Sequence, residues 1–184
     1  METGTDALSL DDFICEMSRE PVSALTHERL MDLTGRLRLS DDLIAGRTRF
    51  ALGSYARNLV CRTETFELLV LCWLPGQAST IHDHAGSLNA IRVHRGELTS
   101  RVFAPAGAAG GGPMALVRED RVRPGQKLVG VDRGGIHQLA DTSGADLVTV
   151  HVYAPALTEI NVYALETAQV ERRTLRYTFA DDLA

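Results

Sequence analysis

Two histidines separated by one residue are the first feature of this sequence that could support chemistry. His82 and His84 flank Asp83 in a segment, residues 79–84, that we predict to be a strand. Alternate side chains project from the same face of a strand, so the two imidazoles point together while Asp83 points away. Such a pair provides half of a site for a first-row transition metal. By itself it is also compatible with ordinary surface histidines.

The residues around this pair strengthen the metal interpretation. Gly76, His82 and Asn89 lie in a run that resembles the first motif of the cupin superfamily, with Asn89 where that motif usually carries glutamate. A weaker second motif around Gly134 supplies His137, which we predict to be the third ligand on a distant strand. Three neutral imidazoles leave the metal its full positive charge. Such a centre suits an anionic sulfur ligand and has open positions for substrate and dioxygen.

Two other predicted strands carry polar residues on one face. Thr149, His151 and Tyr153 alternate with valines, which indicates either a buried polar network or a solvent-facing stripe on an edge strand. Tyr55 and Arg57 share a face in the same way. Arg57 is then either a surface charge or a fixed guanidinium that binds a carboxylate through two hydrogen bonds.

The elements that must position these residues fall into two regions. The chain has 184 residues, of which 45% are hydrophobic and 23% charged, as is typical of one globular domain. Residues 1–50 predict helices at 11–19, at 28–38 and from 43 onward. From residue 51 the apolar period changes to two, and we predict strands at 55–62, 65–73, 79–84, 90–94, 97–104, 114–118, 126–131, 136–140, 146–153 and near 170–179. Short strands separated by turn residues indicate a sandwich or jelly roll, with the Gly/Ala/Pro-rich residues 104–113 as a hairpin connection.

Charge and cysteine content exclude several classes of protein. The net charge of −5 argues against a nucleic-acid partner, which would need a basic face. No apolar run reaches the roughly 20 residues of a membrane helix, and the N-terminal segment lacks the basic start of a signal peptide. Three widely spaced cysteines without a CxxC pair argue against a disulfide framework. We expect a cytoplasmic monomer that has no nucleic-acid or membrane partner.

Five segments together resemble the cysteine dioxygenases of the cupin superfamily, in their bacterial form. They are Tyr55-Ala-Arg57-Asn58-Leu-Val, Leu71-Cys-Trp73, Ile81-His-Asp-His84, Gly135-Ile-His137 and His151-Val-Tyr153-Ala-Pro155, in that order. The first and last segments make the resemblance specific, because a general cupin would not be expected to share them. We expect a mainly β cupin jelly-roll β-barrel (double-stranded β-helix) with N-terminal helices packed on it. Residues 1–184 would be one domain, with 1–50 as the helical cover and 51–184 as the barrel.

The resemblance also implies a metal, a substrate and a reaction. His82, His84 and His137 would hold Fe(II). Free L-cysteine would bind the iron through its thiolate and amine, with its carboxylate on Arg57, while Tyr55 helps to close the pocket. Both atoms of O2, the co-substrate, would pass to sulfur and give cysteine sulfinic acid.

The resemblance assigns the polar stripe to a relay beside the substrate. Tyr153 would donate a hydrogen bond near the substrate carboxylate and oxygen, and His151 would orient it. Thr149 would complete the relay where the family usually has serine. Asn89 occupies the place of a cysteine that crosslinks to the active-site tyrosine in mammalian-type members, so Tyr153 should be an ordinary tyrosine. Asn89 itself would make hydrogen bonds in the substrate pocket.

Several alternatives remain at this point. Relatives that oxidise 3-mercaptopropionate usually have glutamine at the place of Arg57, so the guanidinium favours cysteine over another small thiol carboxylate. A metal-dependent cupin isomerase or lyase would act without oxygen, but would not explain Arg57 together with Tyr153. A non-catalytic cupin sensor is usually fused to a DNA-binding domain, and residues 1–50 show no helix-turn-helix pattern of sufficient length.

Overall fold

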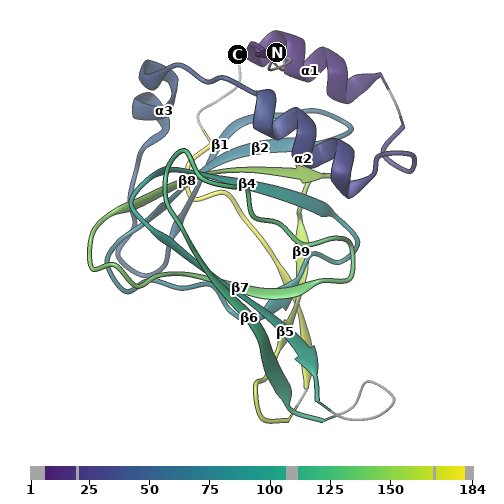
Figure 1. The fold of residues 1–184 in the computed structure, drawn as a ribbon, viewed down its shortest axis with the longest axis vertical. Coiled ribbons are helices and arrows are strands. Elements are labelled where there is room, and N and C mark those ends of the chain that lie inside the picture. Colours follow the sequence, from purple (N-terminus) through teal and green to yellow (C-terminus); the bar gives the residue numbers. More distant parts are fainter. Residues whose placement is uncertain (1–6, 20, 107–111, 168, 181–184) are drawn as a thin grey trace, which may run out of the picture.

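A computed structural model describes residues 7–19, 21–106, 112–167 and 169–180, in which three helices precede ten strands (Figure 1). The helices are α1 (Leu10–Ser18), α2 (His27–Arg36) and α3 (Asp41–Arg47). The strands are β1 (Ala56–Arg62), β2 (Glu67–Trp73), β3 (His82–Asp83), β4 (Leu88–Arg95), β5 (Leu98–Pro105), β6 (Met114–Val122), β7 (Ile136–Asp141), β8 (Leu147–Ala154), β9 (Glu159–Tyr163) and β10 (Val170–Thr174). Residues 107–111, within the predicted hairpin connection, lie outside the described part of the chain.

The strands form two sheets that face one another. One sheet has the order β1-β2-β8-β4, and the other has the order β10-β9-β3-β7-β5-β6. All the strand pairs within them are antiparallel. The chain crosses between the sheets after β2, β3, β4, β7 and β8, which gives the double-stranded β-helix predicted from the sequence. The barrel is not closed, however, because no strand ladder among the described residues joins the two sheets.

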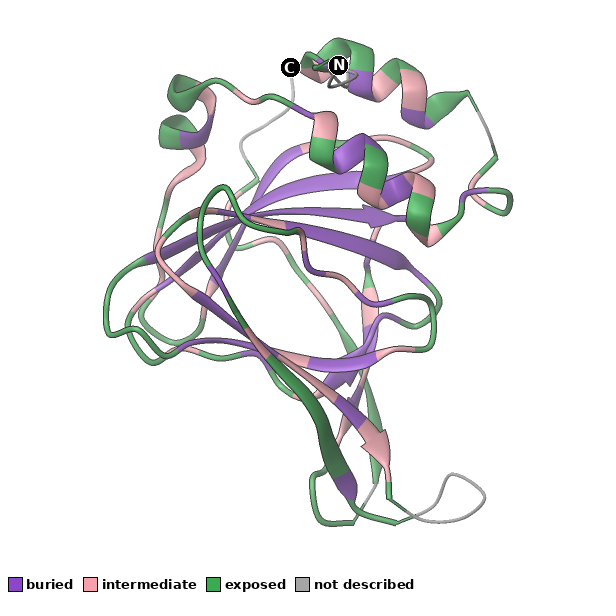
Figure 2. Ribbon diagram, viewed as in Figure 1, coloured by how far each residue is buried: buried purple, intermediate pink, exposed green. Residues whose placement is uncertain are grey.

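The three helices cover the outer face of the first sheet (Figures 1 and 2). Each begins at a residue whose side-chain oxygen accepts a backbone hydrogen bond from the first turn: Ser9 for α1, Thr26 for α2 and Ser40 for α3. This is the capping expected for serine and threonine. Buried residues of the helices, such as Phe13 and Leu30, pack with Val70 and Val150 of the sheet.

The inner face of the first sheet forms a second core between the two sheets. Leu69 and Leu71 of β2 contribute to this inner core, whereas Leu68 and Val70 face the helices. Every residue of β2 and β8 is therefore buried, because both faces of these strands are covered. Strands covered on both faces lose the simple alternation of polar and apolar residues. No helix in the described part of the chain is long and apolar enough to span a membrane.

The observed elements differ from the predicted ones at four places. β9, which pairs with β3 and β10, was not predicted. Residues 126–131 form no strand, and only one bridge joins Val129 to Ile91. β3 is reduced to His82–Asp83, because residues before it make only one bridge, from Ala78 to Ala140. The last predicted strand ends as β10 at Thr174.

Candidate metal centre and substrate pocket

The three predicted histidine ligands meet between the sheets. His82 on β3 and His137 on β7 are register partners, and His84 follows directly after β3. One nitrogen of each ring lies within 4.8 Å of the others, and the Nε2 atoms of His84 and His137 are 3.0 Å apart. All three side chains are buried. The tertiary structure therefore brings together residues that are far apart in the sequence.

Hydrogen bonds in the turn after β3 place His84 beside His82. The Asp83 carboxylate accepts hydrogen bonds from the backbone N–H of Ala85 at 2.8 Å and from Tyr163 Oη at 2.6 Å. Ala85 has a positive φ of 47°, and Ser87 N donates to the carbonyl of His84 at 3.0 Å. These contacts fix the chain direction through the turn.

The donor set fits a metal ion. A ligand nitrogen lies roughly 2.1 Å from a transition metal, so adjacent ligands are separated by roughly 3–3.5 Å. His82 Nδ1 lies 2.8 Å from the carbonyl oxygen of Thr80, a contact that fixes the tautomer and leaves Nε2 available. Burial, together with the neighbouring histidines, holds the pKa of His84 and of His137 well below the usual value. Neutral imidazoles are the form that binds metal.

The polar stripe of β8 forms a continuous hydrogen-bonded network. His151 Nδ1 lies 3.0 Å from Tyr153 Oη, and His151 Nε2 lies 2.9 Å from Thr149 Oγ1. Trp73 Nε1 donates to the same Thr149 hydroxyl at 3.0 Å. All of these residues are buried, so the solvent-facing alternative is excluded. The indole contact was not predicted, although Trp73 lies in one of the segments that carry the family resemblance.

Arg57 is buried and already has a protein partner. Its Nη2 atom donates to Glu67 Oε1 at 3.0 Å and, more weakly, to the carbonyl of Leu157 at 3.4 Å. Its Nε atom is buried and makes no hydrogen bond to a described residue. The guanidinium lies 5.8 Å from the centre of the Tyr153 ring. It is therefore not a surface charge.

Tyr55 and Asn89, the other predicted substrate-binding residues, also border the inner core. The ring of Tyr55 stacks on Trp73 with a centroid separation of 4.1 Å. Asn89 is fully buried on β4 and is the register partner of Tyr153. Its Oδ1 atom accepts from Val131 N at 2.8 Å, whereas its Nδ2 atom has no partner in the described structure.

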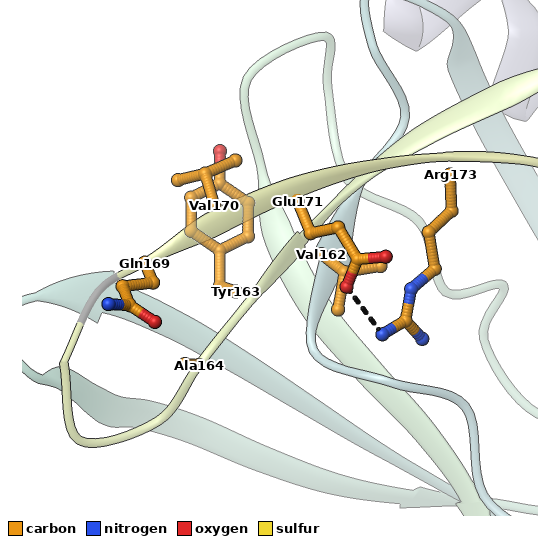
Figure 3. Close-up of a pocket in the computed structure, with 7 residues that line it drawn as sticks. All are labelled: Val162, Tyr163, Ala164, Gln169, Val170, Glu171 and Arg173. Atoms are coloured by element: carbon orange, nitrogen blue, oxygen red, sulfur yellow. Dashed lines mark hydrogen bonds and ion pairs between the residues drawn. The ribbon is translucent and has the colours of Figure 1, made fainter.

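Two cavities are lined by predicted site residues. One, of about 340 Å³, is lined by Tyr55, Arg57 and Thr80 together with the chain after β10. The other, of about 130 Å³, is lined by His84 and by the loop after β8. A third hollow, of about 460 Å³, lies along the β9–β10 hairpin and contains none of the predicted site residues (Figure 3). The smaller of the first two cavities is thus lined by one predicted metal ligand, His84, and the larger by the predicted substrate-binding residues Tyr55 and Arg57.

Sequence reasoning missed Glu67 and Leu157, which contact Arg57, and Tyr177, which contacts Glu67. The backbone N–H of Leu157 and the hydroxyl of Tyr177 both donate to the Glu67 carboxylate, at 3.1 and 2.6 Å. One signal was available for Glu67. In the predicted strand 65–73 it shares a face with Leu69 and Leu71, and a charged residue on such a face is unusual unless it is paired.

Comparison with solved structures agrees with the fold. A protein from Thermus thermophilus has a TM-score of 0.52 and 23% identity, covering 64% of this chain and 97% of that one. A Klebsiella pneumoniae protein described as having a double-stranded β-helix domain has a TM-score of 0.50 and 17% identity, covering 74% and 90%. Two facing antiparallel sheets with three buried histidines between them define a cupin-fold protein with a candidate metal centre.

The chain belongs to the cysteine dioxygenase type I family, whose sequence model matches residues 41–166. It is 28% identical to human cysteine dioxygenase type 1 over 125 residues, which is 67% of this chain and 62% of the human protein. The bovine cysteine dioxygenase type 1 is 32% identical over 103 residues, or 55% of this chain and 51% of that protein. The chain thus matches less than two thirds of the length of these relatives.

Proposed function

We propose that this protein is an Fe(II)-dependent dioxygenase that converts L-cysteine and O2 to cysteine sulfinic acid. The observation that carries the proposal is the juxtaposition of two features: three buried imidazole nitrogens within 4.8 Å of one another, and a buried guanidinium whose Nε makes no hydrogen bond to a described residue. Membership of the cysteine dioxygenase type I family supports the same reaction.

His82, His84 and His137 would hold the iron. Bound Fe(II) would supply a Lewis acid that keeps the substrate thiol deprotonated and a redox centre that activates dioxygen. The protein excludes water from these ligands, since the three side chains are at most 5% exposed. The contact of His82 with the Thr80 carbonyl keeps one ring oriented.

Arg57 would bind the carboxylate of the substrate. Its Nε is a buried donor that needs an acceptor, and a carboxylate on a guanidinium forms a strong charge-assisted hydrogen bond. Because Glu67 already balances the charge of Arg57, a substrate with one thiolate and one carboxylate would neutralise the two positive charges of the metal. A dianionic thiol carboxylate therefore suits the total charge of this pocket.

The β8 network would set where the Tyr153 proton points. Burial lowers the pKa of His151 well below its usual value, with contributions from Arg57 and His82, so one of its ring nitrogens donates and the other accepts. Thr149 Oγ1 lies closer to His151 Nε2, at 2.9 Å, than to the Leu71 carbonyl, at 3.4 Å.

If the threonine donates to the ring, His151 Nδ1–H donates to Tyr153 Oη. Burial raises the pKa of Tyr153 far above its usual value, so its hydroxyl keeps its proton at neutral pH. The tyrosine is then left with a proton to donate into the pocket. In this scheme the hydroxyl of Tyr153 donates a hydrogen bond toward the bound substrate.

Oxygen consumption across a panel of thiols tests the proposal. Purified protein loaded with Fe(II) is given cysteine, 3-mercaptopropionate, cysteamine or mercaptosuccinate, and the product is analysed by mass spectrometry under ¹⁸O2. We expect cysteine to be used best and both labelled atoms to appear in the sulfinate. Preference for 3-mercaptopropionate would reassign the substrate. Absence of oxygen uptake with every thiol would reject the dioxygenase function.

A further inference from the structure

Glu67 is a fully buried carboxylate in contact with Arg57, the residue proposed to bind the substrate carboxylate. It is the first residue of β2, has 0% exposure, and is the register partner of Tyr153 across β2 and β8. By strand alternation its side chain lies on the same inner face as Leu69 and Leu71, which belong to the inner core. No sequence argument placed it in the site.

Three groups from distant parts of the chain bind this carboxylate. Arg57 Nη2 and the backbone N–H of Leu157 donate to Oε1 at 3.0 and 3.1 Å, and Tyr177 Oη donates to Oε2 at 2.6 Å. The carbonyl of Leu157 in turn accepts from Arg57. Glu67 thus connects β1, the loop after β8 and the segment after β10 at one point.

The energetics of this arrangement point to a role in orientation. A buried ion pair gains little stability over apolar residues, because both charges lose their hydration. Its constraint on geometry is large, however, since a guanidinium is planar and its donors are fixed relative to one another. With Nη2 held by Glu67 and Leu157, the direction of the unpartnered Nε is fixed as well.

We propose that Glu67 is the positioning residue that makes this site selective for thiols that carry a carboxylate. It holds the Arg57 guanidinium so that Nε meets the substrate carboxylate, and Tyr177 holds Glu67 from the opposite side. This inference rests on the proposed function and adds to it the residue that determines substrate class.

The test compares two thiols that differ only in the carboxylate. Cysteine and cysteamine share a thiol and an amine. The value of kcat/KM for cysteine divided by that for cysteamine, called the ratio below, therefore measures carboxylate recognition. In Glu67→Gln, which keeps the shape and an acceptor oxygen, we expect the ratio to fall about tenfold, through a higher KM for cysteine. In Arg57→Gln the ratio should fall at least as far. The double variant Arg57→Gln/Glu67→Gln should have the same ratio as Arg57→Gln alone.

Two tyrosine variants provide a second test of the proposal and a control. Tyr177→Phe removes the hydrogen bond to Glu67 Oε2, together with an exposed contact in which Arg62 Nη1 donates to the same hydroxyl at 3.2 Å, and should lower the ratio in the same direction, by a smaller factor. This variant also tests the proposal if Glu67→Gln does not fold. Tyr163→Phe removes a similar hydrogen bond, to Asp83 at 2.6 Å, and should leave the ratio unchanged. Titration calorimetry without oxygen measures the Kd of each thiol. The two Kd values give the same comparison in the absence of turnover.

The outcomes separate this inference from the proposed function. If the wild-type protein prefers cysteine but Glu67→Gln and Tyr177→Phe keep that preference, the role of Glu67 is wrong and the dioxygenase function stands. Equal losses for both thiols, or losses that add to those of Arg57→Gln, would also overturn it. If the wild-type protein uses neither thiol nor any other, both proposals fail.

Discussion

Asn89 on β4 and Tyr153 on β8 are register partners, so their side chains lie on the same inner face of the first sheet. Asn89 joins this face to the segment that follows β6, because its Oδ1 accepts from Val131 N at 2.8 Å. Its Nδ2 remains a buried donor without a partner in the described structure. The residue therefore combines a structural hydrogen bond with a donor beside the proposed substrate pocket.

Replacing this amide should affect stability directly. Asn89→Ala leaves the buried N–H of Val131 without an acceptor, and we expect the free energy of unfolding to fall by about 1–3 kcal/mol. Urea unfolding followed by circular dichroism measures the change. The same variant should lower kcat/KM for cysteine if Nδ2 contacts the substrate. Unchanged stability would show that Val131 finds another partner.

Removal of one histidine ligand should abolish metal binding but not folding. In His84→Ala the two remaining imidazoles cannot hold Fe(II) tightly, so metal content should fall far below one ion per chain. Saturating Fe(II) should stabilise the wild-type protein by about 4 kcal/mol at a thousandfold excess over Kd, and should not stabilise the variant. Metal analysis and thermal unfolding with and without Fe(II) check both statements. Full metal content in His84→Ala would remove this residue from the ligand set.

The Thr149 hydroxyl should matter through its hydrogen bonds and not through its size. Thr149→Val keeps the shape but removes the acceptor of the Trp73 N–H at 3.0 Å and the partner of His151 at 2.9 Å. We expect kcat to fall about tenfold to a hundredfold, as for the loss of a group that orients a proton donor.

Two companion variants complete this prediction. Thr149→Ser restores the hydroxyl and should recover activity. A Thr149→Val/Tyr153→Phe double variant should be no slower than Tyr153→Phe, because both changes act on one network. Steady-state oxygen uptake measures all of them. Additive losses would mean that the threonine acts independently of the tyrosine.

The cysteines should differ in their reactivity toward thiol reagents. Cys15 is exposed, whereas burial raises the pKa of Cys61 and of Cys72 to about 11. Only the thiolate reacts, and at pH 8 a thiol with such a pKa is roughly 0.1% ionised. We expect one fast-reacting thiol in the native protein and three after denaturation. The slow thiols should react faster as pH rises toward 11, and Cys15→Ser should remove the fast phase.

The helical layer should unfold together with the sheets. Phe13 on α1 is fully buried and packs edge-to-face on Phe66, with a centroid separation of 5.5 Å. Phe13→Ala should destabilise the protein by about 3–5 kcal/mol. Leu52→Ala is a control, because that leucine is 94% exposed and its truncation should cost less than about 0.5 kcal/mol.

Trp73 fluorescence and far-ultraviolet circular dichroism should show a single transition at the same denaturant concentration. That result would support one domain over residues 1–184. Separate transitions, with the helices lost first, would instead show that the cover folds as an independent unit.

Local patterns in the sequence predicted the elements and most of the candidate site. Helical periodicity located the starts of α1, α2 and α3 to within two residues, and the alternation in β8 placed Thr149, His151 and Tyr153 on one face. The histidine pair was predicted to converge, and it does so even though the β3 ladder covers only His82–Asp83. These predictions succeeded because side-chain direction follows from backbone geometry over a few residues.

The tertiary structure decided everything that depends on contacts between distant residues. β9 has a local signal that the strand prediction overlooked, because Glu159-Ile-Asn-Val-Tyr163 alternates polar and apolar residues, but its place between β3 and β10 is set only by the tertiary structure. The partners of Arg57 are likewise separated widely along the chain: Glu67 on β2, Leu157 after β8 and, through Glu67, Tyr177 near the C-terminus. Residue types could therefore indicate a metal and a carboxylate-binding arginine. The orientation of that arginine depends on hydrogen bonds to Glu67, on the neighbouring strand of the same sheet, and to Leu157, 100 residues further along the chain. These groups meet only in the folded protein, because no local rule links residues so far apart in sequence.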